Sequence, residues 1–148
     1  MKVSGIIDVG RGLIGPVTPD SPVAEANALM AEHHVGALAV IDANGLLAGI
    51  LSERDIARGL HEHGTGLLDK SVGDLMVRKV ISCTPDTDVR DATSLMIQHG
   101  IRHLPVLDGE TPLTIISIRD IVATRLGSLE IDNEILRAQL QELSSGGG

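Results

Sequence analysis

Two short segments of the sequence combine a hydroxyl, a guanidinium and a carboxylate at the same spacing. They read Ser52-Glu53-Arg54-Asp55 and Ser117-Ile118-Arg119-Asp120. The free amide groups at the start of a helix suit phosphate, and an arginine beside them adds a planar, multi-donor cation. A carboxylate at the same place can accept two ribose hydroxyl groups. The pattern therefore favours recognition of a phosphorylated sugar at two related sites.

The same spacing also has a purely structural interpretation. In a capping box, a serine at the N-cap accepts from the amide three residues later, and an acid at that position reaches back to the N-cap amide. Capping needs the serine and the acid but not the arginine. Because both segments share the arginine, the balance shifts toward ligand binding, with capping as the alternative.

Both segments belong to a tandem repeat. Val17-Thr18-Pro19-Asp20 recurs as Cys83-Thr84-Pro85-Asp86, 66 positions later. Beginning at Val23 and at Val89, apolar residues at i, i+3, i+6 and i+7 predict an amphipathic helix in each copy. Apolar runs bounded by turn residues predict buried strands at 38–41, 47–51, 104–107 and 113–116.

The sequence therefore predicts an α+β fold of two β-α-β-β-α units of about 60 residues each, packed with pseudo-twofold symmetry, plus a C-terminal helix. Interfaces between such units are preferred ligand sites. The expected segments are a first repeat, a linker, a second repeat, a C-terminal helix and a disordered tail, at 5–62, 63–77, 78–127, 128–143 and 144–148 respectively.

The C-terminal helix carries Leu129, Leu136 and Leu143 at seven-residue intervals, with Leu140 beside them. Two heptads are too short a run to indicate a coiled coil by themselves. The helix is expected to pack either on its own domain or against another subunit.

Composition limits the classes of function. The net charge is −8 and the 12 basic residues are dispersed, which argues against non-specific nucleic-acid binding. No apolar run approaches the roughly 18 residues of a membrane span, and the N-terminus has no long apolar stretch, so a cytoplasmic protein without a membrane partner is expected. Phe, Tyr and Trp are absent, so a planar base would lie between aliphatic side chains.

The sequence offers no set of nucleophile, base and orienting group, so catalysis is not expected. His33, His34, His61 and His63 lack the cysteine or carboxylate partners of a metal site and are expected on helix ends and the linker. The single cysteine, Cys83, is expected in a buried strand. No cofactor is required.

Taken together, the two copies resemble the CBS-domain pair, named after cystathionine β-synthase, in its small stand-alone bacterial form. The family signature Gly-hydrophobic-x-Ser/Thr-x-x-Asp matches 49–55 and, with Thr114 in place of glycine, 114–120. Ile101-Arg102-His103-Leu104-Pro105-Val106 also matches. The resemblance covers residues 5 to 127. It implies a non-enzymatic regulatory module that binds AMP, ADP or ATP between the repeats and forms a homodimer through exposed helices.

The resemblance also implies the residues around the nucleotide. Both motif aspartates would bind ribose, the motif serines and arginines would lie near ribose or phosphate, and the strands at Thr18 and Thr84 would read adenine. The predicted set is Thr18, Gly36, Ala37, Ser52, Arg54, Asp55, Thr84, Ile101, Arg102, His103, Pro105, Ser117, Arg119 and Asp120.

The two clefts are expected to be unequal. Arg102 and His103 would face phosphate in the second site, whereas Gly36 and Ala37 at the equivalent first-copy positions carry no charge. This asymmetry favours the Asp120 cleft for phosphate. The side chain of Thr114, which stands where the family has glycine, would crowd a ligand in this cleft.

Two other functions stay open. One is a structural or protein-interaction module without nucleotide binding, which Thr114 and the uncharged first-copy loop would suit. The other is a binder of another adenosyl ligand, S-adenosylmethionine or NAD. The sequence does not indicate which protein is regulated.

Overall fold

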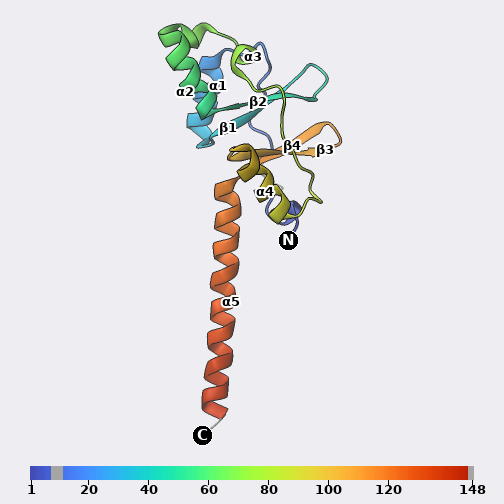
Figure 1. The fold of residues 1–148 in the computed structure, drawn as a ribbon, viewed down its shortest axis with the longest axis vertical. Coiled ribbons are helices and arrows are strands. Elements are labelled where there is room, and N and C mark those ends of the chain that lie inside the picture. The colour runs from blue at the N-terminus through green and yellow to red at the C-terminus, as the bar shows by residue number, and fades with distance from the viewer. Residues whose placement is uncertain (8–11, 147–148) are drawn as a thin grey trace.

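The computed structural model describes residues 1–7 and 12–146 of the chain. Each repeat contributes a helix, an antiparallel hairpin and a second helix, in that order (Figure 1). The elements of the first repeat are α1 (Val23–His33), β1 (Ala37–Ile41), β2 (Leu47–Ser52) and α2 (Glu53–His63). Those of the second are α4 (Val89–His99), β3 (His103–Asp108), β4 (Thr111–Ser117) and α5 (Ile118–Gly146).

Equivalent hydrogen bonds mark the pseudo-twofold relationship of the repeats. The amide of Glu53 donates to the Gly36 carbonyl at 3.0 Å, and the amide of Ile118 donates to the Arg102 carbonyl at 2.9 Å. Each bond ties the start of a repeat's final helix to the residue just before its hairpin. The predicted α+β class and tandem arrangement are confirmed.

Each repeat has its own aliphatic core. Leu38, Val40 and Leu51 are fully buried in the first core, and Leu104, Val106 and Ile116 in the second. These residues alternate along their strands, so one face of each hairpin packs against the helices. Cys83 is buried in the second core, as expected.

The strands expected at the start of each repeat, near Val17 and Cys83, do not form. Val17 accepts a hydrogen bond from the Ile41 amide at 2.9 Å, and Cys83 makes one isolated bridge to Val106, but neither segment forms a strand. Pro16 and Pro19 flank Val17, and a proline donates no backbone hydrogen bond to a sheet. The hairpins are therefore two-stranded sheets with one short contact at the edge.

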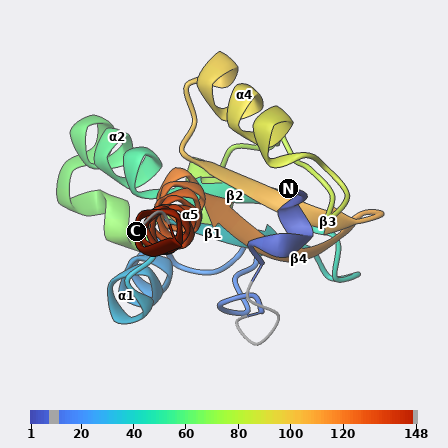
Figure 2. The same ribbon diagram turned by 90° about the horizontal axis from the view of Figure 1, so that it is seen from below.

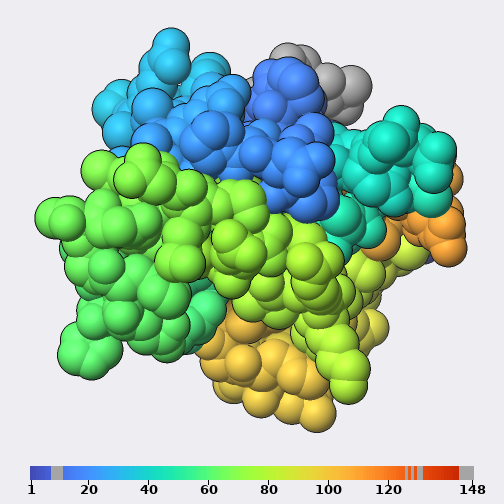
Figure 3. Space-filling view, turned by 90° about the horizontal axis from the view of Figure 1, so that it is seen from above, coloured from blue at the N-terminus to red at the C-terminus, as the bar shows by residue number. Residues whose placement is uncertain are grey.

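The predicted linker, 63–77, is part of the first core. It folds into a 3₁₀ helix (Gly64–Asp69) and α3 (Val72–Leu75), and Leu67 and Val72 are buried against the first repeat. In Figure 3 the green surface of this segment lies directly against the blue surface near α1. Its apolar residues explain the difference, because a solvated linker would leave them in water.

The N-terminal segment lies with the second repeat, although the sequence analysis placed the start of the first repeat at residue 5. Val3, in the 3₁₀ helix Val3–Gly5, is fully buried in the second core, and its amide donates to the Thr87 carbonyl at 2.8 Å. The chain therefore begins on one repeat and then crosses to the other.

The final helix is longer than predicted. A separate helix at 128–143 was expected, but α5 runs without a break from 118 to 146 and projects from the body (Figures 1 and 2). Gly127 lies inside this helix. A glycine in a helix interior lowers the stability of the helix by only about 1 kcal/mol relative to alanine, so it need not end the helix. Residues 144–146 of the expected disordered tail are helical, and 147–148 lie outside the described residues. Among residues 1–7 and 12–146, no helix combines the length and apolar character needed to cross a membrane.

Candidate functional site

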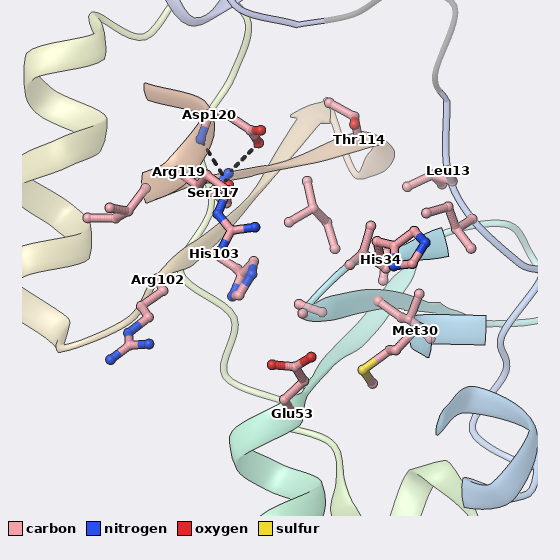
Figure 4. A pocket seen from close by; sticks show the side chains of 18 of the residues that line it. Leu13, Met30, His34, Glu53, Arg102, His103, Thr114, Ser117, Arg119 and Asp120 are labelled. Atoms are coloured by element: carbon pink, nitrogen blue, oxygen red, sulfur yellow. Dashed lines mark hydrogen bonds between the residues drawn. The ribbon is translucent and has the colours of Figure 1, made fainter. Parts of the chain in front are cut away.

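A cleft of about 1050 Å³ lies between the two repeats. The first repeat supplies the segment 12–14, the end of α1 and the start of β1, and the second repeat supplies β4 and the first turns of α5. Figure 4 shows Leu13, Met30 and His34 across the cleft from Thr114 and Asp120. Both repeats are therefore needed to form this site.

The aspartate of the second motif sits at the rim of this cleft. Its Oδ2 accepts from the Ser117 amide at 2.9 Å, and the Asp120 amide donates to the Ser117 hydroxyl at 3.1 Å (Figure 4). These reciprocal bonds are a capping box. Among the described residues, Oδ1 of Asp120 has no hydrogen-bond partner. Capping therefore uses one carboxylate oxygen and leaves the other without a partner among these residues.

The aspartate of the first motif is in a different state. Asp55 is 4% exposed, and its Oδ2 accepts from the Ser52 amide and hydroxyl at 2.9 and 3.0 Å. Its Oδ1 accepts from Nη2 of Arg58 at 2.9 Å. Both oxygens are thus satisfied within the protein. Asp55 does not line the cleft.

The cations of the cleft come from the second repeat. Arg102 and Arg119 both line it, and no side-chain hydrogen bond or ion pair joins either one to another described residue. Arg54, the counterpart of Arg119, instead donates through Nη1 to the carbonyl of Gly100 at 3.0 Å, at the end of α4. In the sequence, Arg54 and Arg119 hold the same position in the two motifs, and both were predicted to lie near ribose or phosphate. In the fold, Arg54 binds the C-terminal end of α4, whereas Arg119 lines the cleft.

His103 lies beside the middle of the cleft. A Cβ built on Gly36 would come within 3.0 Å of the imidazole of His103 and 3.5 Å of a carboxylate oxygen of Glu53. Burial lowers the pKa of His103 below its ordinary 6.5, and Arg102 acts in the same direction, whereas Glu53 and Asp120 oppose the shift. At neutral pH the imidazole is therefore neutral. The neutral ring can donate a hydrogen bond, but the positive charge in the cleft is carried by Arg102 and Arg119.

Aliphatic side chains line the first-repeat side of the cleft. They include Leu13, Ile14 and Met30, with Ile115 opposite on β4. Such surfaces suit the faces of a planar base in a chain without aromatic residues. Thr114 also lines the cleft and is buried, so its side chain narrows the site, as the sequence suggested.

The exchange of Gly49 for Thr114 between the repeats has a local cause. A Cβ on Gly49 would lie 2.7 Å from the Val77 carbonyl oxygen and 2.9 Å from the sulfur of Met76. Val77 crosses β2 there and exchanges two backbone hydrogen bonds with Ile50. Gly49 is therefore required for the chain crossing.

The fold and this cleft match a known family. The family model of the CBS domain matches residues 14–62 and 72–127. The chain belongs to the CBS-domain family. Among curated relatives, the CBS domain-containing protein YhcV of Bacillus subtilis is 31% identical, over 85% of this chain and 89% of its own. An uncharacterised 17.7 kDa protein of Acidianus ambivalens is 38% identical over 74% of this chain, which spans only 66% of that relative.

Solved CBS structures share the fold. A CBS-domain-containing protein from Agrobacterium tumefaciens has a TM-score of 0.78 at 30% identity, covering 84% of this chain and 99% of that one. The CBS pair of protein MJ0100, solved with 5′-methylthioadenosine and S-adenosyl-L-methionine, scores 0.73 at 26% identity, with coverages of 86% and 98%. CBSX2, solved with AMP, scores 0.72 at 28% identity, with coverages of 85% and 96%.

The CBS pair brings half of the predicted nucleotide-binding residues together. Those lining the cleft are Gly36, Ala37, Arg102, His103, Ser117, Arg119 and Asp120. Those outside it are Thr18, Ser52, Arg54, Asp55, Thr84, Ile101 and Pro105. Gly36 and Ala37 were expected at a separate first site, but pseudo-twofold packing places the starts of β1 and β3 side by side.

Sequence reasoning missed three cleft residues that matter for charge and access: His34, Glu53 and Ala123. Only Ala123 had a readable signal, since it stands where the first repeat has Arg58. Within the described part of the chain, His, Cys, Asp and Glu side chains do not gather in any group of three that could hold a metal ion.

Proposed function

We propose that this CBS pair is a non-enzymatic sensor that binds one adenine nucleotide in the cleft between its repeats. Asp120 would accept the ribose hydroxyls through its open oxygen. Arg102 and Arg119 would meet the phosphates, and the base would lie against Leu13, Ile14 and neighbouring aliphatic side chains. Occupancy would change the relative arrangement of the repeats, because a ligand shifts an equilibrium toward the state it binds better.

The observation that carries this proposal is that Oδ1 of Asp120, at the rim of the cleft, accepts no hydrogen bond from any residue that the structure describes. Asp55 has the same motif but has both oxygens occupied. Capping alone would leave both aspartates alike. The proposal therefore assigns the nucleotide to the Asp120 cleft, with one molecule bound per chain.

The class of ligand is supported by the relatives. One solved CBS pair holds S-adenosyl-L-methionine and 5′-methylthioadenosine, and another holds AMP. Arg102 and Arg119 line the cleft, and no described side chain pairs with either one, which favours a phosphorylated member of this group in the present chain. S-Adenosylmethionine, which carries a positive sulfonium, and NAD are the alternative ligands. A structural or interaction module without nucleotide binding is the alternative function.

Calorimetric titration with AMP, ADP, ATP, NAD and S-adenosylmethionine tests the proposal. We expect binding of at least one adenine nucleotide near a 1:1 ratio, and weaker binding of S-adenosylmethionine. Absence of both heat and thermal shift at millimolar nucleotide would leave the interaction-module alternative. Because the chain lacks Trp and Tyr, absorbance at 260 nm in purified protein would report a co-purified nucleotide, which mass spectrometry would identify.

The cytoplasmic location stays a prediction. A homodimer through exposed helices is likewise an expectation from the family.

A further inference from the structure

The outer part of α5 has an apolar stripe that no residue among 1–7 and 12–146 covers. Leu129, Leu136, Leu140 and Leu143 are 55%, 55%, 64% and 74% exposed. They belong to the segment 129–143 of α5, the part of the helix that projects from the body (Figure 1). The alternative in which this helix packs on its own domain is therefore wrong. Four large aliphatic side chains in water on one helix indicate an interaction surface.

The stripe has the period of a two-stranded coiled coil. Val122, Leu129, Leu136 and Leu143 are seven residues apart and occupy position d when a heptad is written abcdefg. Val122, which also lines the cleft, is 50% exposed, so continuity of α5 extends the run to three heptads. Position a then holds Leu126, Asn133 and Leu140. Leucine at d with a single asparagine at a is typical of parallel dimers, in which the two asparagines pair and fix the register.

The charges beside the seam agree with this assignment. Asp132 falls at position g and Arg137 at position e, and both are exposed. In a parallel, in-register dimer, position g of one helix faces the next position e of its partner. Asp132 of each chain would therefore meet Arg137 of the other, twice by symmetry. The surface is complementary to itself, which identifies the occupant.

We propose that α5 forms a parallel, in-register coiled coil with α5 of a second copy of this chain. The seam from 122 to 143 would be about 33 Å long at 1.5 Å per residue. It would place the two bodies at the same end of the coil. The proposal does not depend on nucleotide binding.

The test measures the mass of the full chain by sedimentation, with two matched variants. We expect wild type to sediment at twice the 15.5 kDa chain mass. Leu136→Glu should weaken the dimer roughly a hundredfold or more, because each partner loses a buried leucine and gains a charge. Ile135→Glu is the control. Ile135 is 52% exposed on the same turn but falls at position c, outside the seam.

Three results would overturn the proposal. They are a monomeric wild type at high micromolar concentration, a dimer that survives Leu136→Glu, and equal effects of the two variants. A surviving dimer would place the interface on the body, where Leu60 of α2 and Ile97 of α4 are exposed. Cooperative thermal unfolding of each variant, followed by circular dichroism, shows that the repeats still fold.

Cross-linking tests the orientation separately. Leu143→Cys should oxidise to a covalent dimer, because a parallel coil brings the two positions together at d. Wild type, whose single cysteine is buried, is the control. An antiparallel coil would put the two cysteines at opposite ends, so a dimer that fails to cross-link contradicts the parallel arrangement.

Discussion

Arg58 donates to Asp55 across one turn of α2 at 2.9 Å, and the two side chains are 52% and 6% exposed. Ala123 occupies the equivalent position in α5 and lines the cleft. The two motifs therefore share a capping box but differ in what faces the second carboxylate oxygen. This one difference separates a structural aspartate from a candidate ligand aspartate.

The first prediction compares the two aspartates. Asp120→Asn should reduce nucleotide affinity by about tenfold or more, because it replaces a charged acceptor of ribose hydrogen bonds. Stability should change little, since the amide oxygen of asparagine can still accept from the Ser117 amide. Asp55→Asn should lower the free energy of unfolding by about 1–3 kcal/mol and leave affinity nearly unchanged. Calorimetry and urea unfolding measure the two effects, and equal losses of affinity would contradict the assignment of one site.

The second prediction transfers the arginine. Ala123→Arg should pair with Asp120 as Arg58 pairs with Asp55, and should abolish nucleotide binding while the fold is retained. The outcome is measured by calorimetric titration of the variant beside wild type. Ala123→Leu, which fills space without adding charge, is the control. If both substitutions weaken binding equally, the effect is steric and Oδ1 of Asp120 is not the determinant.

The third prediction concerns pH. His103 has a pKa below its ordinary 6.5 in the folded chain, so between 6.5 and that lower value the unfolded chain binds more protons. The free energy of unfolding should therefore fall as the pH drops through this window, and the loss should level off below the folded pKa. His103→Gln should reduce this slope. Urea unfolding at several pH values from 7.5 to 5 measures both proteins; parallel curves would rule out His103 as the cause.

The fourth prediction uses two glycines. Gly49→Ala should destabilise the fold by roughly 1–3 kcal/mol, because its Cβ would overlap backbone at Val77. Gly127→Ala should stabilise the chain by about 1 kcal/mol, since the residue is helical and nothing lies within 4 Å of the added carbon. Thermal unfolding distinguishes the opposite signs. A neutral Gly49→Ala would mean that the chain crossing at Val77 adapts easily.

The fifth prediction concerns Asn133. Replacement by leucine should stabilise the association of α5 but relax its specificity, so that species larger than a dimer form. Sedimentation equilibrium over a range of concentrations would detect them. Glu134→Leu, one residue along at position b, is the control. A variant that stays strictly dimeric would indicate that Asn133 does not set the oligomeric state.

Local patterns in the sequence determined much of this protein. The offset between the copies, the alternating apolar runs and the Ser-x-x-Asp spacing predicted the tandem fold, the hairpins and the helix starts, since each depends on residues a few positions apart. The difference between Arg58 and Ala123 could also have been read, because residues three apart on a helix are neighbours.

Tertiary structure decided the rest. Only packing shows that Leu67 joins the first core and Val3 the second, because burial depends on contacts between distant segments. Whether α5 continues through Gly127 depends on a difference in helix stability of only about 1 kcal/mol. A local sequence pattern does not determine the outcome of so small a difference. Pseudo-twofold packing brings Gly36 beside His103. The sequence thus supplied two similar motifs, and the interface between the repeats left one aspartate of the two facing a cleft.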